Sequence, residues 1–355
     1  MTVIASYNHF GCGLVLGDIL TNGPVGEGNI PQTNLPTLGN VINFFEGNWA
    51  ICKPAQKVCI ITDYCALAWA GSQVHASLFV ERLVKLSKRI RINESIIECL
   101  LNKCGENKVS IVGSIHEDGS LKTFGYGSEK FICPILGNVY AAGSGSSIIK
   151  DYLNIIENMM LEAPHEDEIA VRGVSLILTQ VAHLLNAEFR KGDTADSIRE
   201  FFGGGYEIAA FYDGKFQKIT SNFVFFDIVF EDGYLEIENP LLLISQTYSD
   251  RNLRFEAVSL RARYDDEVVR HDIIEIPSFH GSACNDFSAW TGSNISWVCF
   301  VFVDDFKFFG KELISIILKS DTPPINYSVI EGRLEVSYSP KTQLEIQKSL
   351  MSIYG

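Results

Sequence analysis

The sequence is short of basic charge. It contains 29 lysine and arginine residues against 43 aspartate and glutamate residues, so its formal net charge is −14 at pH 7. Proteins that bind nucleic acid need a basic face that displaces the counterions of the phosphates, and this composition argues against that class of function. A local basic run over residues 85–91 is interspersed with Leu86 and Ile90, which is typical of a solvated helix face.

Long hydrophobic runs and metal-ligand motifs are also lacking. No uninterrupted apolar run reaches the ~18 residues of a membrane span, and residues 2–10 have no basic leader of the kind that opens a signal peptide. The nine cysteines form no Cys-x-x-Cys pair and no cluster with histidine. We therefore expect free thiols, no metal site, no cofactor, no membrane contact and a cytoplasmic location.

What the sequence does contain is enough apolar residues for two folded domains. Of its 355 residues, 46% are hydrophobic and 20% are charged, far from the composition of disordered chains. We place the domain boundary after residue 220, and we expect residues 19–52, rich in glycine, proline, asparagine and threonine, to form a long inserted loop. Residues 221–355 predict a β-rich second domain, in which residues 313–318 fit a strand or a helix.

The first 220 residues alternate between runs of strands and runs of helices. The spacing of apolar residues predicts helices over 74–90, 94–103, 148–161 and 168–189, with strand pairs before, between and after the two helix pairs. The runs over 58–61 and 64–70 are apolar almost throughout, which indicates burial on both faces. This order is typical of an α+β domain in which two sheets pack face to face under outer layers of helices.

The residues that suggest chemistry lie at the start of the chain. If Met1 is removed, Thr2 carries a hydroxyl and an α-amine on one residue, and an amine with a pKa near ~8 can take the hydroxyl proton at neutral pH. A hairpin around residues 11–13 would bring Asp18 back beside Thr2. Residues 143–147 join a strand to a helix, so backbone N–H groups and hydroxyls meet there at a helix N-terminus.

In their order along the chain, these features resemble a known family. The chain resembles proteasome β-subunits, and most of all the bacterial peptidase subunit of the heat-shock locus, in five places: Thr2 directly after Met1, Gly17-Asp18, Lys57-Val58, Ala70-Gly71-Ser72 before a helix, and Ala142-Gly143-Ser144-Gly145-Ser146 before another helix. The resemblance covers residues 2 to about 220. It implies the four-layer αββα sandwich of the N-terminal nucleophile (Ntn) hydrolases, followed here by a β-rich C-terminal domain.

The resemblance also implies a role for each matching residue. Thr2 would be the nucleophile and its freed α-amine the base. Asp18 would orient the catalytic lysine, and that lysine, Lys57, would lower the pKa of the Thr2 hydroxyl through its positive charge. The backbone N–H of Gly71 would form the oxyanion hole, and Ser144 would hydrogen-bond the α-amine.

Two assignments stay open at this level. Lys53 is a second candidate for the catalytic lysine. We favour Lys57 because Lys57 opens a strand. The family carries Asp-x-x-Ser before a Gly-Gly strand, and the corresponding place here reads Glu200-Phe201-Phe202-Gly203-Gly204, so Glu200 can stand in for the aspartate while the serine is absent. Three residues of the preceding loop are candidates to reach in instead: Asp193, Asp196 and Ser197.

The sequence thus predicts a threonine-type hydrolase of peptide bonds or other amide bonds. The resemblance implies a homo-oligomer, often a ring fed by an ATPase or another regulatory partner, that acts on a peptide or protein substrate. One alternative is a catalytically inactive proteasome-like scaffold or binding protein, and another gives the main function to the C-terminal domain as a binder or sensor. A scaffold needs none of the five matching residues, so their joint presence favours the enzyme.

Overall fold

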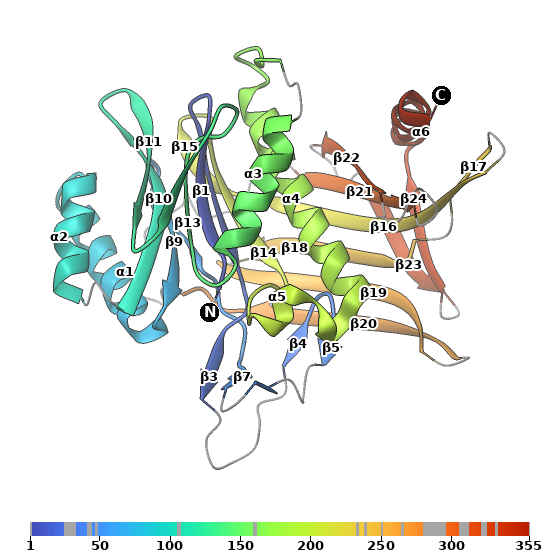
Figure 1. Cartoon of the computed structure of the whole chain (residues 1–355), viewed down its shortest axis with the longest axis horizontal. Helices are drawn as coiled ribbons and strands as arrows, with labels where there is room; N and C mark the ends of the chain where they lie inside the picture. The colour runs from blue at the N-terminus through green and yellow to red at the C-terminus, as the bar shows by residue number, and fades with distance from the viewer. Residues whose placement is uncertain are drawn as a thin grey trace. The chain divides into compact units, whose positions relative to one another are not determined.

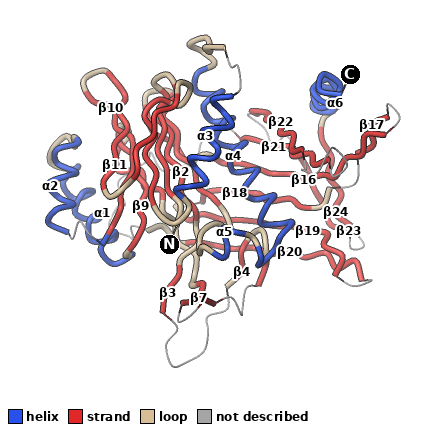
Figure 2. Tube along the Cα trace, in the orientation of Figure 1, coloured by secondary structure: helices blue, strands red, loops and turns tan. Residues whose placement is uncertain are grey.

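The structure, a computed structural model, is of mixed α+β type, and strands predominate over helices (Figure 2). It describes residues 2–24, 33–40, 45–46, 49–104, 108–158, 162–231, 234–237, 240–249, 251–263, 266–279, 296–304, 312–320, 325–330 and 333–354.

The chain folds into two compact units. The first comprises Met1–Ile219, Tyr248–Leu253 and Ile276–Gly292, and the second comprises Thr220–Thr247, Arg254–Glu275 and Ser293–Gly355. The division therefore begins at residue 220, next to the boundary placed from the sequence. Two later segments return to the first unit, and no local sequence pattern indicates that they do.

Two antiparallel sheets form the centre of the first unit (Figure 1). The larger has the order β12-β13-β1-β2-β14-β15, with strands β1 (Ile4–His9), β2 (Cys12–Asp18), β12 (Glu129–Cys133), β13 (Gly137–Ala142), β14 (Tyr206–Tyr212) and β15 (Lys215–Lys218). The smaller has the order β11-β10-β9-β8, with strands β8 (Val58–Thr62), β9 (Cys65–Gly71), β10 (Val109–Glu117) and β11 (Ser120–Tyr126). Strands β8 and β9 are buried along almost their whole length, as their apolar composition predicts.

The two sheets share one buried apolar cluster. Ile4 and Val15 of the larger sheet pack in it against Ile60, Ala68 and Val112 of the smaller sheet. Such a cluster requires the two sheets to face each other, which places the ends of β1, β2 and β8 close together in space. This closeness positions the candidate site.

Helices pack on the outer face of each sheet (Figure 1). Helices α1 (Gln73–Ser87) and α2 (Glu94–Cys104) pack on the smaller sheet, and α3 (Ser146–Asn158) and α4 (Ile169–Lys191) pack on the larger one. All four lie within a few residues of the helices predicted from apolar spacing. A 3₁₀ turn, η2 (Gly192–Thr194), and the short helix α5 (Asp196–Arg199) lead from α4 towards β14.

We expected a long loop over residues 19–52, and the structure shows that this segment also contains short strands. Strands β3 (Asn22–Pro24), β7 (Trp49–Ile51) and β6 (Phe45–Glu46) form one small sheet, and β4 (Asn34–Leu35) pairs with β5 (Gly39–Asn40). Leu20, Leu35 and Ile51 are buried in one cluster with Ile198 and Phe201. These three residues of the segment are therefore packed on the chain that precedes β14.

Helix α4 is long and apolar enough to cross a membrane by length and composition alone. In this structure 56% of its most apolar window is buried, and it packs on β1, β2 and β14. Its apolar composition is accounted for by that packing.

The second unit is built on one seven-stranded sheet. Its order is β20-β19-β18-β16-β21-β22, with β17 also paired to β16, and the strands are β16 (Thr220–Glu231), β17 (Tyr234–Ile237), β18 (Leu242–Ser249), β19 (Asn252–Arg263), β20 (Asp266–Ile276), β21 (Ser296–Asp304) and β22 (Glu312–Ser320). The hairpin β23 (Ile325–Ile330) and β24 (Arg333–Tyr338) and the helix α6 (Pro340–Tyr354) follow. Residues 313–318 are thus part of a strand, and Ile346 and Leu350 of α6 pack on aromatic residues of β16 and β21.

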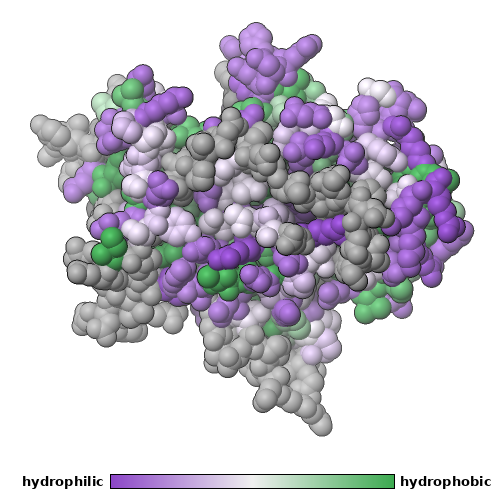
Figure 3. Space-filling model, turned by 180° about the vertical axis from the view of Figure 1, so that it is seen from behind, coloured by the Kyte–Doolittle hydropathy of each residue, from purple (hydrophilic) through white to green (hydrophobic). Residues whose placement is uncertain are grey.

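Exposed apolar side chains are scattered over several elements. Val74 in α1, Ile132 in β12 and Met351 in α6 are among the most exposed. On the face seen in Figure 3, hydrophilic residues cover most of the described surface and hydrophobic residues form separate small groups. Single exposed apolar residues of this kind are ordinary on protein surfaces.

Candidate active site

Thr2 lies at the entry to β1, and the β1–β2 hairpin places it beside Asp18. The register pairs Ile4 with Gly17, and the next rung is closed by a hydrogen bond from the backbone N–H of Asp18 to the carbonyl of Val3 (3.1 Å). The Thr2 hydroxyl donates to Oδ1 of Asp18, and the backbone N–H of Val3 donates to the same oxygen (3.0 Å). The juxtaposition expected from the hairpin is therefore present.

Lys57 completes the cluster from the other sheet. It directly precedes β8, and its ammonium lies 2.7 Å from Oδ1 of Asp18. It also donates to the Thr2 hydroxyl oxygen and to the backbone carbonyl of Leu20 (2.5 Å). Thr2, Asp18 and Lys57 are 1%, 0% and 1% exposed, so the three polar side chains meet inside the protein.

The Asp18 carboxylate is fixed on both oxygens. While Oδ1 binds the groups just described, Oδ2 accepts the backbone N–H of Leu20 (3.2 Å) and that of Gly203 (3.0 Å). The loop before β14 therefore contacts the cluster through its backbone. A carboxylate held by this many donors keeps one orientation, so the position of Lys57 relative to Thr2 is also fixed.

Burial lowers the pKa of Lys57, and the nearby charges of Asp18 and Glu207 oppose this effect. The direction matters because Lys57 donates to the Thr2 hydroxyl. A lysine with a lowered pKa gives up its proton more readily than an ordinary lysine, and the Thr2 hydroxyl oxygen lies within its hydrogen-bonding reach.

Glu207 holds Lys57 in place and was not anticipated. Its Oε2 accepts the backbone N–H groups of Lys57 (2.7 Å) and Val58 (3.2 Å), and its Oε1 accepts the ammonium of Lys218 (2.5 Å). Lys218 and Glu207 form an ion pair whose side chains are 2% and 0% exposed. The sequence does place Glu207 inside an otherwise apolar strand. An acidic residue in such a strand indicates a buried partner, although the sequence does not identify that partner.

Glu188 organises the loop that contacts Asp18, and it too was not anticipated. It accepts the hydroxyls of Thr37 (2.9 Å), Ser197 (3.1 Å) and Tyr206 (2.8 Å) and the backbone N–H of Gly204 (3.0 Å). Gly203 is next to Gly204, so this carboxyl group positions the N–H that binds Asp18. Glu188 is therefore a positioning residue that acts through the loop.

The titration of Glu188 gives a testable dependence of stability on pH. Burial raises its pKa from 4.5 to about 7, although its four hydrogen bonds oppose the rise. A carboxyl group whose pKa is higher in the folded chain contributes stability below its unfolded value of 4.5, and this contribution is lost as the pH rises through 7. We expect the free energy of unfolding to fall by about 3 kcal/mol more in the native chain than in Glu188→Gln across that range.

Urea unfolding at several pH values between about 4.5 and 7.5 measures this difference. The exposed acid Glu98 provides the control, because Glu98→Gln makes the same chemical change on the surface, away from the buried hydrogen bonds of Glu188. Parallel profiles for the native chain and Glu188→Gln would contradict the assignment.

Gly71 ends β9 and lines a cavity of about 390 Å³ that contains Thr2 and Lys57. Its φ is +95°, and a Cβ at this position would lie 2.5 Å from the carbonyl oxygen of Lys108, so the backbone here requires glycine. Trp69, Ser72 and other residues complete the walls. A substrate carbonyl in this cavity can approach both the Thr2 hydroxyl and the end of β9.

The Gly-Ser loop contacts Thr2 through its backbone. The N–H of Gly145 donates to the carbonyl of Thr2 (3.1 Å), and a Cβ on Gly143 would lie 2.0 Å from that carbonyl oxygen. Ser144, expected to bind the α-amine, donates its hydroxyl to the backbone carbonyl of Glu200 (2.7 Å). Glu200 therefore contacts the Gly-Ser loop through its backbone carbonyl, and the residue is exposed.

The remaining candidates lie elsewhere. Lys53 is exposed and its carbonyl accepts the hydroxyl of Thr21 (2.6 Å), so Lys57, not Lys53, is the lysine at Thr2. Asp196 is exposed and pairs with Lys191 at 3.3 Å, and Asp193 is also exposed. Within the residues that the structure describes, no group of three histidine, cysteine, aspartate or glutamate side chains is placed to hold a metal ion.

No protein-family model matches the chain, and a search of curated proteins finds no match. The cluster consists of a buried hydroxyl in contact with a carboxylate and an ammonium group, and it faces a cavity.

Proposed function

We propose that this chain is a threonine-type N-terminal nucleophile hydrolase that cleaves peptide or other amide bonds through Thr2 once Met1 is removed. The observation that carries the proposal is the buried contact of the Thr2 hydroxyl with Asp18 and Lys57. A scaffold needs none of these three side chains at this place, and burying charged groups costs free energy that only pairing and hydrogen bonds offset.

The sandwich-like packing supports the same proposal. The resemblance implies an αββα Ntn-hydrolase sandwich, and two sheets that share a core and carry helices on their outer faces are what such a sandwich requires. Thr2 lies just before β1, which is an inner strand of the larger sheet, between β13 and β2.

The proposed reaction has two steps. The Thr2 hydroxyl oxygen attacks the amide carbon while its proton passes to the freed α-amine, with Lys57 stabilising the negative charge that develops on the oxygen. The backbone N–H of Gly71 stabilises the oxyanion, and the α-amine then protonates the leaving nitrogen, which departs as an amine. Water, deprotonated by the α-amine, attacks the resulting ester, releases the carboxylic acid and restores Thr2.

A panel of fluorogenic peptide amides tests the proposal. The full chain should be expressed, its N-terminus identified by mass, and initial rates measured for preparations with and without Met1. We expect hydrolysis only from the preparation that begins with Thr2, because an amide nitrogen cannot act as the base. A preparation that begins with Thr2 and cleaves none of a broad panel would contradict the proposal.

A second candidate function is a catalytically inactive member of the same fold, used for assembly or binding. One observation favours it: the Ser144 hydroxyl, expected at the α-amine, is bonded to the Glu200 carbonyl. The peptide panel separates the two candidates directly.

By resemblance, we further propose a cytoplasmic homo-oligomer, supplied with peptide or protein substrate by an ATPase or another regulatory partner. Size-exclusion chromatography with light scattering tests the oligomeric part. A strictly monomeric chain that cleaves peptides would contradict that part alone.

A further inference from the structure

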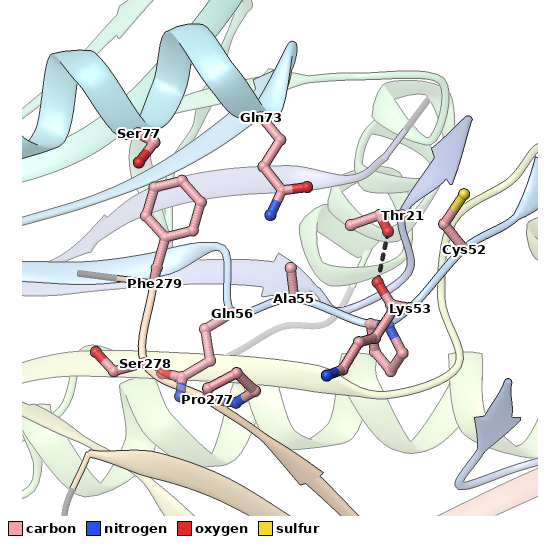
Figure 4. Close-up of a pocket in the computed structure, with 11 residues that line it drawn as sticks. Thr21, Cys52, Lys53, Ala55, Gln56, Gln73, Ser77, Pro277, Ser278 and Phe279 are labelled. Atoms are coloured by element: carbon pink, nitrogen blue, oxygen red, sulfur yellow. Dashed lines mark hydrogen bonds between the residues drawn. The ribbon is translucent and has the colours of Figure 1, made fainter. Parts of the chain in front are cut away.

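A second cavity, also about 390 Å³, adjoins the one that contains Thr2. The two cavities share Thr21 and Gln73 in their walls. In Figure 4, Gln73 projects from α1 into the space, Phe279 stands on one side and Thr21 on the other. A substrate held with its carbonyl at Thr2 can therefore place a neighbouring side chain in this second cavity.

The wall of this cavity is completed by residues that follow position 220 in the sequence. Pro277, Ser278 and Phe279 belong to the first unit although they come after β20. The ring of Phe279 stacks on Trp69, with centroids 4.7 Å apart and an angle of 27° between the planes. Trp69 also lines the Thr2 cavity, so the stacked pair stands between the two spaces.

Hydrogen bonds fix this wall. The side-chain amide of Gln56 donates to the backbone carbonyls of Arg251 (2.8 Å) and Ile276 (3.0 Å), one from each returning segment. The indole N–H of Trp69 donates to the backbone carbonyl of Gln56 (3.3 Å). Gln56 is one residue before Lys57, so the wall and the candidate lysine are held by neighbouring residues.

The chemistry of the lining favours a negatively charged guest. Lys53 is the single charged residue among the eleven described residues that line the cavity, and no acidic residue is among them. Gln73 and Ser77 add groups that can donate hydrogen bonds, while Ala55, Pro277 and Phe279 supply apolar surface for a short aliphatic chain. A carboxylate on such a chain matches this arrangement, and an ammonium group is repelled by Lys53.

We propose that this cavity is a substrate pocket for an acidic side chain, with Lys53 selecting its charge and Phe279 forming its wall. The proposal rests on the proposed function for its meaning as a substrate pocket, but its binding chemistry can be tested alone. It gives the segment after residue 220 a definite role in substrate selection, and it assigns Lys53 a function different from that of a catalytic lysine.

Binding of three peptides to the full-length Thr2→Val variant, which cannot form the ester, provides the test. The probes are acetyl-Ala-Ala-Glu, acetyl-Ala-Ala-Leu and acetyl-Ala-Ala-Lys, all amidated at the C-terminus, and calorimetry gives the Kd of each. We expect the glutamate peptide to bind about tenfold more tightly than the other two, as for a charge pair at a partly exposed site.

Variants identify the residues responsible. Adding Lys53→Glu should reverse the preference towards the lysine peptide, whereas Lys150→Glu, the same charge change on an exposed face of α3, should leave it unchanged. Adding Phe279→Ala should weaken the glutamate and leucine peptides by a similar factor of about five to ten, because the wall serves both. Unfolding curves show whether each variant retains the native fold.

Equal affinity for the three peptides, no binding of any of them, or an unchanged order in the Lys53→Glu variant would each overturn the pocket assignment. Failure of the proposed function would look different. In that case the glutamate peptide binds with the expected preference, and the native chain without Met1 cleaves none of the amide panel.

Discussion

Replacing Thr2 by valine is expected to abolish amide hydrolysis, with a loss in kcat/KM of about 10³-fold or more. Valine keeps the branched shape of a residue that is only 1% exposed, but it has no hydroxyl. In the native structure that hydroxyl donates to Asp18 and accepts from Lys57, so its loss removes the only atom that can attack the substrate in the proposed reaction. Initial rates on the amides cleaved by the native chain measure the effect.

Thr2→Ser is the matched control for this experiment. Serine keeps the hydroxyl, and both serine and valine are small enough at position 2 to allow removal of Met1. We expect the serine variant to retain measurable hydrolysis and to react with the same electrophiles as the native chain. A valine variant that folds normally and keeps more than about a tenth of the native rate would show that the reaction takes place elsewhere.

Replacing Lys57 by methionine is expected to have the second-largest effect, on both rate and stability. The ammonium group pairs with Asp18 at 2.7 Å, and both side chains are almost fully buried. Removing one partner of a buried ion pair lowers the free energy of unfolding by about 3–5 kcal/mol. We expect a loss of about 3 kcal/mol here, because three backbone N–H groups still donate to the Asp18 carboxylate. We expect kcat/KM to fall by about 10³-fold as well, since the hydroxyl loses its positive neighbour.

The double variant Lys57→Met with Asp18→Asn separates the two effects. Without its carboxylate charge, the site no longer holds an unpaired ion, so part of the lost stability should return while hydrolysis stays absent. Denaturant unfolding and peptide assays on the same four proteins complete the cycle. If loss of Lys57 lowers stability but leaves kcat/KM unchanged, the lysine is structural and has no part in the reaction.

The parts of the site that are predictable from the sequence are those fixed by short-range pairing. A hairpin around residues 11–13 determines which residue faces Thr2, so Asp18 could be named from spacing alone. Lys57 could be favoured over Lys53 because it opens a strand, and it does directly precede β8. The positions of α1–α4 follow from apolar periodicity, which is also local information.

The parts that escaped prediction depend on contacts between distant segments. Glu207 and Glu188 are buried carboxyl groups, and each has a partner far away in the sequence: the backbone N–H of Lys57 for Glu207 and the hydroxyl of Thr37 for Glu188. The hydroxyl of Ser144 donates to the backbone carbonyl of Glu200, which belongs to another loop. The sequence gives no clear signal for strand β12, because it is largely exposed, with Ile132 76% exposed and only Cys133 buried, so it lacks a strong apolar alternation.

The return of late segments to the first unit could not be predicted for the same reason. Residues 277–279 are a short Pro-Ser-Phe sequence at the end of a strand, and their place beside Trp69 depends on the folded arrangement of distant strands. A boundary placed after residue 220 treats each domain as one continuous segment, so it assigns Tyr248–Leu253 and Ile276–Gly292 to the second domain although they belong to the first unit.

Intact-mass spectrometry after treatment with a peptide epoxyketone shows whether Thr2, once freed of Met1, is a nucleophile. We expect a native chain that lacks Met1 and gains the mass of one adduct, which peptide mapping places on Thr2 and which the Thr2→Val variant does not gain. A chain that lacks Met1, folds normally and gains no adduct, or that carries its adduct on another residue, would contradict the assignment of Thr2 as the nucleophile.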